Sequence, residues 1–146
     1  MTCRRYASIA ACWFTAAGLV SAQPTAPQAV REATLGRWHL SLHDKAGRCR
    51  LRSQADTLPS REVATAIPWP CAFHLDRQGA VRVLPHKGQS VVLLESSLVV
   101  DPANCVTHLQ ALRLLRTGVK LSESHDRVAS CPPFQWDDMM FTALFK

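Results

Sequence analysis

The sequence predicts an all-β fold: a small antiparallel β-barrel, up-and-down or trefoil-like, that ends in a short helical or extended C-terminal tail. Three pairs of segments with strand-like alternation of apolar and polar residues recur roughly every forty residues, each pair joined by turn residues. Cysteines at positions 49, 71, 105 and 131 are spread through the same part of the chain. Evenly spaced hairpins of this kind are typical of small barrels, in which closure removes the exposed strand edges.

The first hairpin is predicted over residues 38–51. From Trp38 to His43, large apolar residues alternate with two histidines and a serine, which is the period of a strand that buries one face. Asp-Lys-Ala-Gly at 44–47 supplies a turn, and the alternation resumes in residues 49–51.

Two further hairpins are predicted from the same pattern. Residues 80–94 contain apolar segments on either side of Pro-His-Lys-Gly at 85–88. Residues 119–129 contain shorter apolar segments on either side of Glu-Ser-His-Asp at 123–126.

Helix is predicted in two places only, residues 105–115 and the tail at 134–145. In the tail, four apolar residues would share one face of a helix: Trp136, Met139, Met140 and Leu144.

Residues 1–22 are predicted to be an export signal. Two arginines precede an apolar run from Ile9 to Val20, and small residues at its end fit a signal-peptidase site, so the mature chain would begin at Gln23 in the periplasm or outside the cell. A membrane anchor is the rival interpretation, but the run is shorter than the roughly 20 residues that a span needs. A lipoprotein signal ending at Cys12 is a second alternative, with an apolar region of only about six residues against the roughly 7–15 of ordinary signals.

The mature chain is expected to be one domain and a monomer, without a membrane span. Residues 23–35 hold prolines and alanines but little to bury, which predicts an extended N-terminal arm; residues 36–146 form the disulfide-bonded barrel with its tail. Two of the 17 Lys and Arg, and none of the 11 Asp and Glu, lie in the signal, which leaves a formal charge of +4. This charge is spread out, and even the alternating Arg48, Arg50 and Arg52 fit a solvated strand face, so nucleic-acid binding is not expected.

Cysteine usage agrees with export. The four cysteines that remain after cleavage predict two disulfides among Cys49, Cys71, Cys105 and Cys131. Sequential pairing would close two loops of similar length, although the sequence leaves all three connectivities open. Two Cys-x-x-His pairs also have the ligand types of a zinc site, but disulfide formation is the simpler use of four thiols in an oxidising compartment. No metal or cofactor is therefore predicted.

No catalytic residues are predicted. The sequence has no glycine-rich phosphate loop, zinc-protease helix motif or calcium loop. The neighbouring carboxylates Asp137 and Asp138 would point in different directions on a strand or a helix. A non-enzymatic binding or inhibitory domain is favoured over an enzyme.

Two stretches resemble the AprI/Inh family of periplasmic metalloprotease inhibitors. An export signal and a proline-bearing arm precede Gly-Arg-Trp-His-Leu-Ser at 36–41 and Cys-Arg-Leu at 49–51, similar to the family's Gly-x-Trp-x-Leu/Val-Ser strand and its partner strand with a disulfide cysteine. Asp-Pro-Ala-Asn-Cys at 101–105, with residues 118–128, resembles the family's later cysteine and hairpin. The resemblance implies an eight-stranded antiparallel barrel. Family members have one bridge, so Cys49 would pair with either Cys71 or Cys105.

The resemblance also implies a mechanism, in which the barrel holds the N-terminal arm in the active-site cleft of a secreted serralysin-type zinc metalloprotease. The arm residues that would enter the cleft are Gln23, Pro24, Thr25, Ala26 and Pro27. A segment held by a rigid scaffold loses less entropy on binding, and its two prolines stiffen it further.

Two alternatives of a different class remain. One is a barrel-type or trefoil-type binding module in which the hairpins carry the ligand. The other is an envelope adaptor whose C-terminal segment docks on a partner through Trp136 and Phe141.

Overall fold

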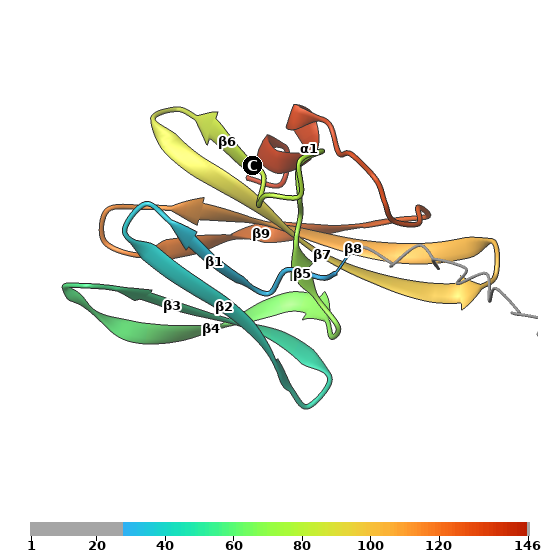
Figure 1. Ribbon diagram of the computed structural model, residues 1–146, viewed down its shortest axis with the longest axis horizontal. Coiled ribbons are helices and arrows are strands. Elements are labelled where there is room, and N and C mark those ends of the chain that lie inside the picture. Colours follow the sequence, from blue (N-terminus) through green and yellow to red (C-terminus); the bar gives the residue numbers. More distant parts are fainter. Residues whose placement is uncertain (1–27, 146) are drawn as a thin grey trace, which may run out of the picture.

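The computed structural model describes residues 28–145, which form two antiparallel sheets and one short helix (Figure 1). The first sheet has the order β1 (Glu32–Leu35), β2 (Trp38–Lys45), β3 (Arg48–Ala55) and β4 (Leu58–Pro68). The second has the order β5 (Ala72–Phe73), β7 (Gln89–Asp101), β8 (Asn104–Leu114) and β9 (Val119–Val128), and β6 (Val83–His86) also pairs with β7. Helix α1 (Asp138–Thr142) follows. The predicted signal, the cleft-binding residues 23–27 and Lys146 lie outside the described residues.

The all-β prediction is confirmed, but the two sheets do not close into a barrel. No strand ladder joins the edges of the first sheet to the second within residues 28–145. At the crossing between the sheets, Pro68 and Pro70 lack the backbone N–H that would continue a ladder. The sheets instead pack through a shared hydrophobic cluster.

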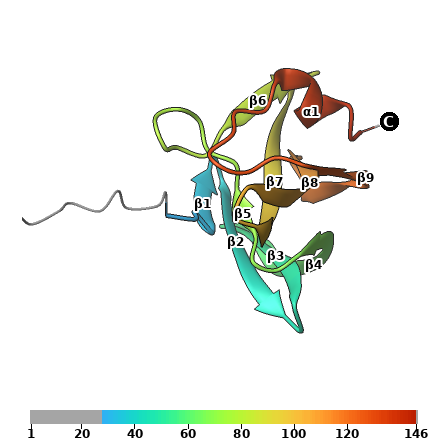
Figure 2. The same cartoon turned by 90° about the vertical axis from the view of Figure 1, so that its right-hand side faces the viewer.

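The second sheet is covered on both faces. Residues 91–94 of β7 are all fully buried. Val92 and Leu94 join β2, β3 and β4 in the first cluster, while Val91 and Leu93 face a second cluster beneath the C-terminal segment. Helix α1 accordingly lies on the opposite side of the second sheet from β2 and β3 (Figures 1 and 2).

The first two predicted hairpins are confirmed as β2–β3 and β6–β7. Their turns contain Ala46 and Gly47, with φ of 53° and 73°, and Lys87 and Gly88, with φ of 50° and 75°. Two successive residues with positive φ are typical of tight hairpin turns whose twist matches that of the strands.

The third predicted hairpin is wrong, because residues 119–128 form the single strand β9 along β8. The polar residues at 123–126, predicted to be a turn, lie on an exposed edge strand. At a register shift in β8, the Ser122 hydroxyl accepts a hydrogen bond from the N–H of Ala111 at 3.1 Å. The polarity of this stretch therefore reflects an edge position instead of a chain reversal.

The helix predicted at 105–115 is also wrong: these residues belong almost entirely to strand β8. Burial on both faces removes the two-residue alternation by which a strand is recognised. In the tail the helix is only five residues long. Phe141 and Leu144 are buried whereas Met139 is exposed, so the predicted apolar face of the tail is only partly right.

The second half of the predicted arm is not free. Residues 32–35 form β1 and pair with β2, in a register from Glu32 opposite Ser41 to Leu35 opposite Trp38. The apolar side chains of Ala33 and Leu35 pack against the first cluster, and this packing holds the segment against β2.

The disulfides pair sequentially, Cys49 with Cys71 and Cys105 with Cys131. The first joins β3 to the residue before β5 and so links the two sheets, while the second joins β8 to the start of the C-terminal segment. In the described part of the chain no three His, Cys, Asp or Glu side chains are grouped to hold a metal ion. None of the helices in that part is long and apolar enough to cross a membrane.

Candidate functional site

A groove of about 410 Å³ lies where the start of the described chain meets the second sheet. Its walls are residues 28–31, residues 70–77 around β5, and residues 132–135 of the C-terminal segment. Glu95 and Ser97 of β7 also line it. The volume is within the roughly 300–1,000 Å³ of typical ligand pockets.

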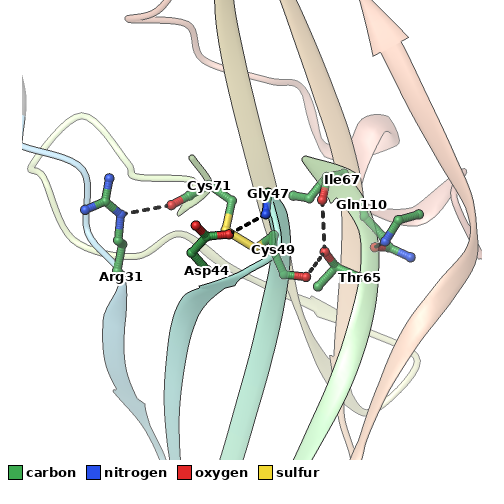
Figure 3. The surroundings of a disulfide bond; sticks show 9 residues. Arg31, Asp44, Gly47, Cys49, Thr65, Ile67, Cys71 and Gln110 are labelled. Atoms are coloured by element: carbon green, nitrogen blue, oxygen red, sulfur yellow. Dashed lines mark hydrogen bonds between the residues drawn. A yellow bond between two sulfur atoms is a disulfide. The ribbon is translucent and has the colours of Figure 1, made fainter. Parts of the chain in front are cut away.

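The wall formed by residues 28–31 is anchored to the disulfide-linked core. The Arg31 Nε donates a hydrogen bond to the carbonyl of Cys71 at 3.3 Å (Figure 3), and its guanidinium lies 4.7 Å from the centre of the Trp69 ring. Backbone N–H groups of Leu42 and Phe73 donate to the carbonyls of Arg31 and Val30, at 2.8 and 2.9 Å. The chain is thus fixed within the predicted arm, shortly after the cleft-binding residues 23–27.

The lining of the groove combines apolar side chains with polar and charged ones. The apolar lining comes from all three walls: Val30, Pro70, Phe73, Leu75, Pro132, Pro133 and Phe134. Asp76, Arg77 and Gln28 add polar atoms. Such a lining suits an apolar group whose orientation a few polar contacts fix.

One wall of the groove is held by a carboxylate shared between three segments. Nδ1 of the buried His74 lies 3.1 Å from Oε2 of Glu95, and the Trp136 indole N–H donates to the same oxygen at 3.0 Å. Glu95 therefore ties the β5 region and the C-terminal segment to β7. Nε2 of His74 is buried without a hydrogen-bond partner among the described residues.

Trp136 and Phe141, predicted as partner-binding residues, are both buried. Phe141 packs edge-on against His74, with ring centroids 5.9 Å apart, and Trp136 belongs to the same second cluster. Their burial accounts for their apolar character without a partner. The exposed apolar side chains of this segment are Phe134, at 45 %, and Met139, at 72 %.

A second exposed apolar feature is the end of the β7–β8 hairpin, which extends beyond the rest of the sheet (Figure 1). Val99 is 75 % exposed there. Alternate residues of a strand share a face, and the register is regular from Glu95 to Val99, so Val99 lies on the same face as the groove residues Glu95 and Ser97. The Cys105–Cys131 bridge ties this end of the hairpin to the C-terminal segment, because Cys105 lies opposite Val99.

The arginines that alternate along β3 lie on the outer face of the first sheet, as predicted. Arg52 there lies 3.8 Å from Glu62, which also accepts a hydrogen bond from His43 at 3.1 Å and pairs with Lys45 at 3.5 Å. Desolvation raises the pKa of Glu62, but the His43 hydrogen bond and the Lys45 charge outweigh it and hold that pKa below its usual value. These partly exposed ion pairs describe a solvated surface.

Sequence reasoning did not find the groove. The Cys-x-x-His spacing draws attention to His74 only through a zinc interpretation that the four cysteines disfavour, and its partner Glu95 carries no local signal. The groove forms between segments far apart in the sequence, and the Cys71 bridge that positions one wall was the available hint.

No protein-family model matches the chain, and no curated protein or solved structure is significantly similar to it. The resemblance to the AprI/Inh motifs therefore stays a prediction.

Proposed function

We propose that the chain is an exported inhibitor of a secreted zinc metalloprotease, which it binds by placing residues 23–27 in the protease cleft. The observation that carries this proposal is the anchoring of the segment that follows directly. The carbonyls of Val30 and Arg31 accept hydrogen bonds from β5 and β2, and the Arg31 side chain contacts Cys71 and Trp69.

The anchoring supports an inhibitory arm because it lowers the cost of binding. A short segment that leaves a rigid body at a fixed point has fewer conformations to lose than a long tail. The Cys49–Cys71 bridge adds rigidity at this point, since it joins the first sheet to the strand that holds Val30. Pro24 and Pro27 restrict the arm itself.

The proposed compartment is supported by the disulfides. All four cysteines of the described residues are paired, and such bridges persist in oxidising environments such as the periplasm or the extracellular space. A secreted protease would meet the chain in the same environment.

The test is inhibition of a panel of secreted zinc and serine proteases, including a serralysin-type enzyme, by the oxidised chain 23–146. Selective inhibition of a zinc protease is the expected result. Circular dichroism and a thiol assay confirm that each sample is folded and fully bridged. Absence of inhibition by such a sample across the zinc enzymes contradicts the proposal.

The groove favours a second candidate, a non-enzymatic binding module that acts without the arm. Its apolar walls surround a volume suited to a ligand, and they belong to the described body of the domain. This candidate predicts a binding activity that the chain 28–146 retains in full, whereas an inhibitor that uses its arm loses its activity on the same truncation.

A further inference from the structure

We infer that the groove receives an apolar side chain of the same protein that takes the N-terminal arm. The inference rests on the proposed function and adds a second contact to that interface. It makes the groove a determinant of which protease is recognised.

The short distance between the arm and the groove is the first argument. Gln28 lines the groove, so only the five residues 23–27 precede it in the predicted mature chain. At the roughly 3.3–3.6 Å that an extended residue spans, five residues reach at most about 18 Å. A protein that holds these residues in its cleft therefore lies within this distance of the groove.

The lining of the groove defines the chemistry of the occupant. The side chains of Val30, Leu75 and Phe134 offer apolar surface from three walls. Phe134 is 45 % exposed and stacks on Trp136 with ring centroids 4.3 Å apart, so it presents a supported aromatic surface. A leucine, methionine or phenylalanine side chain on the partner fits this lining, and aromatic residues and methionine are enriched at protein interfaces.

The arm itself is a poor occupant of the groove. Gln-Pro-Thr-Ala-Pro contains no large aliphatic or aromatic side chain, and its prolines cannot donate backbone hydrogen bonds. A second copy of the chain is the other possible occupant, through exposed residues such as Val99 or Met139. Both occupants are distinguishable outcomes of the experiments below.

The first experiment measures inhibition constants against the protease that the oxidised chain 23–146 inhibits most strongly in the panel. Phe134→Ala should weaken inhibition about ten-fold, because truncating a central apolar contact commonly costs this much. Met139→Ala is the matched control: this residue is a large, exposed apolar residue of the same segment but does not line the groove, so inhibition should not change.

A second variant guards against damage to the Phe134–Trp136 stacking. Ala29 is exposed on the groove wall, and Ala29→Arg should obstruct the groove without removing any packing, again weakening inhibition about ten-fold. Ala143→Arg, at an exposed alanine outside the groove, is its control. Unchanged inhibition by both groove variants, with inhibition still dependent on residues 23–27, would overturn this inference and leave the proposed function standing.

A protease-independent readout separates the two claims. N-acetyl-leucinamide is titrated into the chain 23–146 while amide chemical shifts are followed by nuclear magnetic resonance. Shifts at Ala72 and Leu75, which both line the groove, are expected in the chain 23–146 and should disappear in Ala29→Arg, even if no protease in the panel is inhibited. Absence of those shifts in the chain 28–146 as well as in 23–146 overturns the inference. Shifts that appear only after residues 23–27 are removed would show that the arm occupies the groove. A dimer in sedimentation that Phe134→Ala dissociates would show that a second copy of the chain occupies it. Either result also overturns the inference.

Discussion

The two hydrophobic clusters of this domain differ in how they are built. The first lies between the sheets and collects side chains from β2, β3, β4, β5, β7 and β8, with the Cys49–Cys71 bridge inside it. The second lies on the far face of the second sheet, where, among residues 28–145, most of the cover comes from Trp136, Phe141 and Leu144 of the C-terminal segment. The first cluster is therefore common to the whole fold, whereas the second depends on one short segment.

This difference assigns different tasks to the two regions. The first cluster and its bridge hold residues 28–31, from which the proposed inhibitory arm extends. The C-terminal segment forms one wall of the groove and is tied down by Glu95 and by the Cys105–Cys131 bridge. Anchoring of the arm should consequently survive changes to the second cluster.

The largest expected effect comes from two phenylalanines, one in each cluster and both fully buried. Phe73→Ala should lower the free energy of unfolding by about 3–5 kcal/mol, the usual cost of a large core cavity. Phe141→Ala should cost less, because the C-terminal segment can detach while the sheets stay folded. Denaturant unfolding gives both values, and hydrogen exchange should show that Phe141→Ala exposes residues 132–145 selectively. Equal losses with uniform exchange would contradict the separation of the clusters.

The next largest effect is expected from the two disulfides, one of which lies in the first cluster. Replacing Cys49 and Cys71 by Ala should lower the free energy of unfolding by about 2–4 kcal/mol. The same change at Cys105 and Cys131 should lower the free energy of unfolding less, although the two closed loops are similar in length. The reason is burial: Cys131 is exposed, whereas Cys49 and Cys71 are both buried. Thermal unfolding of the two double variants decides the order, and a greater loss from the second pair would refute it.

Two tryptophans offer a smaller and matched pair of changes. Trp136→Phe removes an indole hydrogen bond to the carboxylate of Glu95, and a bond to a charged group contributes about 1.5–3 kcal/mol. Trp38→Phe removes a 3.1 Å bond to the neutral carbonyl of Leu115, for which about 0.5–1.5 kcal/mol is expected. Urea unfolding at neutral pH measures both. If Trp38→Phe is the more damaging change, Glu95 does not hold the C-terminal segment as described.

The smallest expected effect depends on pH. Burial, then the charge of Arg127, holds the pKa of His108 below its usual value of 6.5. The unfolded chain therefore binds this proton more readily, so the free energy of unfolding should fall as the pH drops through about 6.5 and level off below the lower, folded-state pKa. His108→Gln should remove this part of the pH dependence, and Arg127→Gln should reduce it. Unfolding curves between pH 5 and 8 that are unaltered by either change would contradict this origin.

Alternation in the sequence identified strand β2, whereas the doubly buried β7 was identified by an apolar run beside a turn. The alternation from Trp38 to His43 marks β2 correctly because its other face meets solvent. In β8 both faces are covered, so the pattern disappears and the segment resembles a helix. Strand β4 was not predicted, since its first residues are exposed and polar.

The candidate site was less predictable than the fold. The sequence predicted two disulfides among the four cysteines but left three connectivities open, and the structure shows the sequential one. Of the predicted arm, residues 32–35 form a strand instead. Nothing in the local sequence shows that Arg31 stacks on Trp69, or that Glu95 binds both His74 and Trp136, because these contacts arise only when distant segments pack together. Tertiary contacts of this kind leave no periodic signal.

We propose that residues 23–27 inhibit a secreted zinc protease because the residues that follow them are held by the body of the domain. The most direct measurement compares the inhibition constants of the oxidised chains 23–146 and 28–146 against the same serralysin-type enzyme. We predict strong inhibition by the longer chain and its loss in the shorter one, with unchanged folding. Equal inhibition by the two chains, or none by either, would contradict the claim.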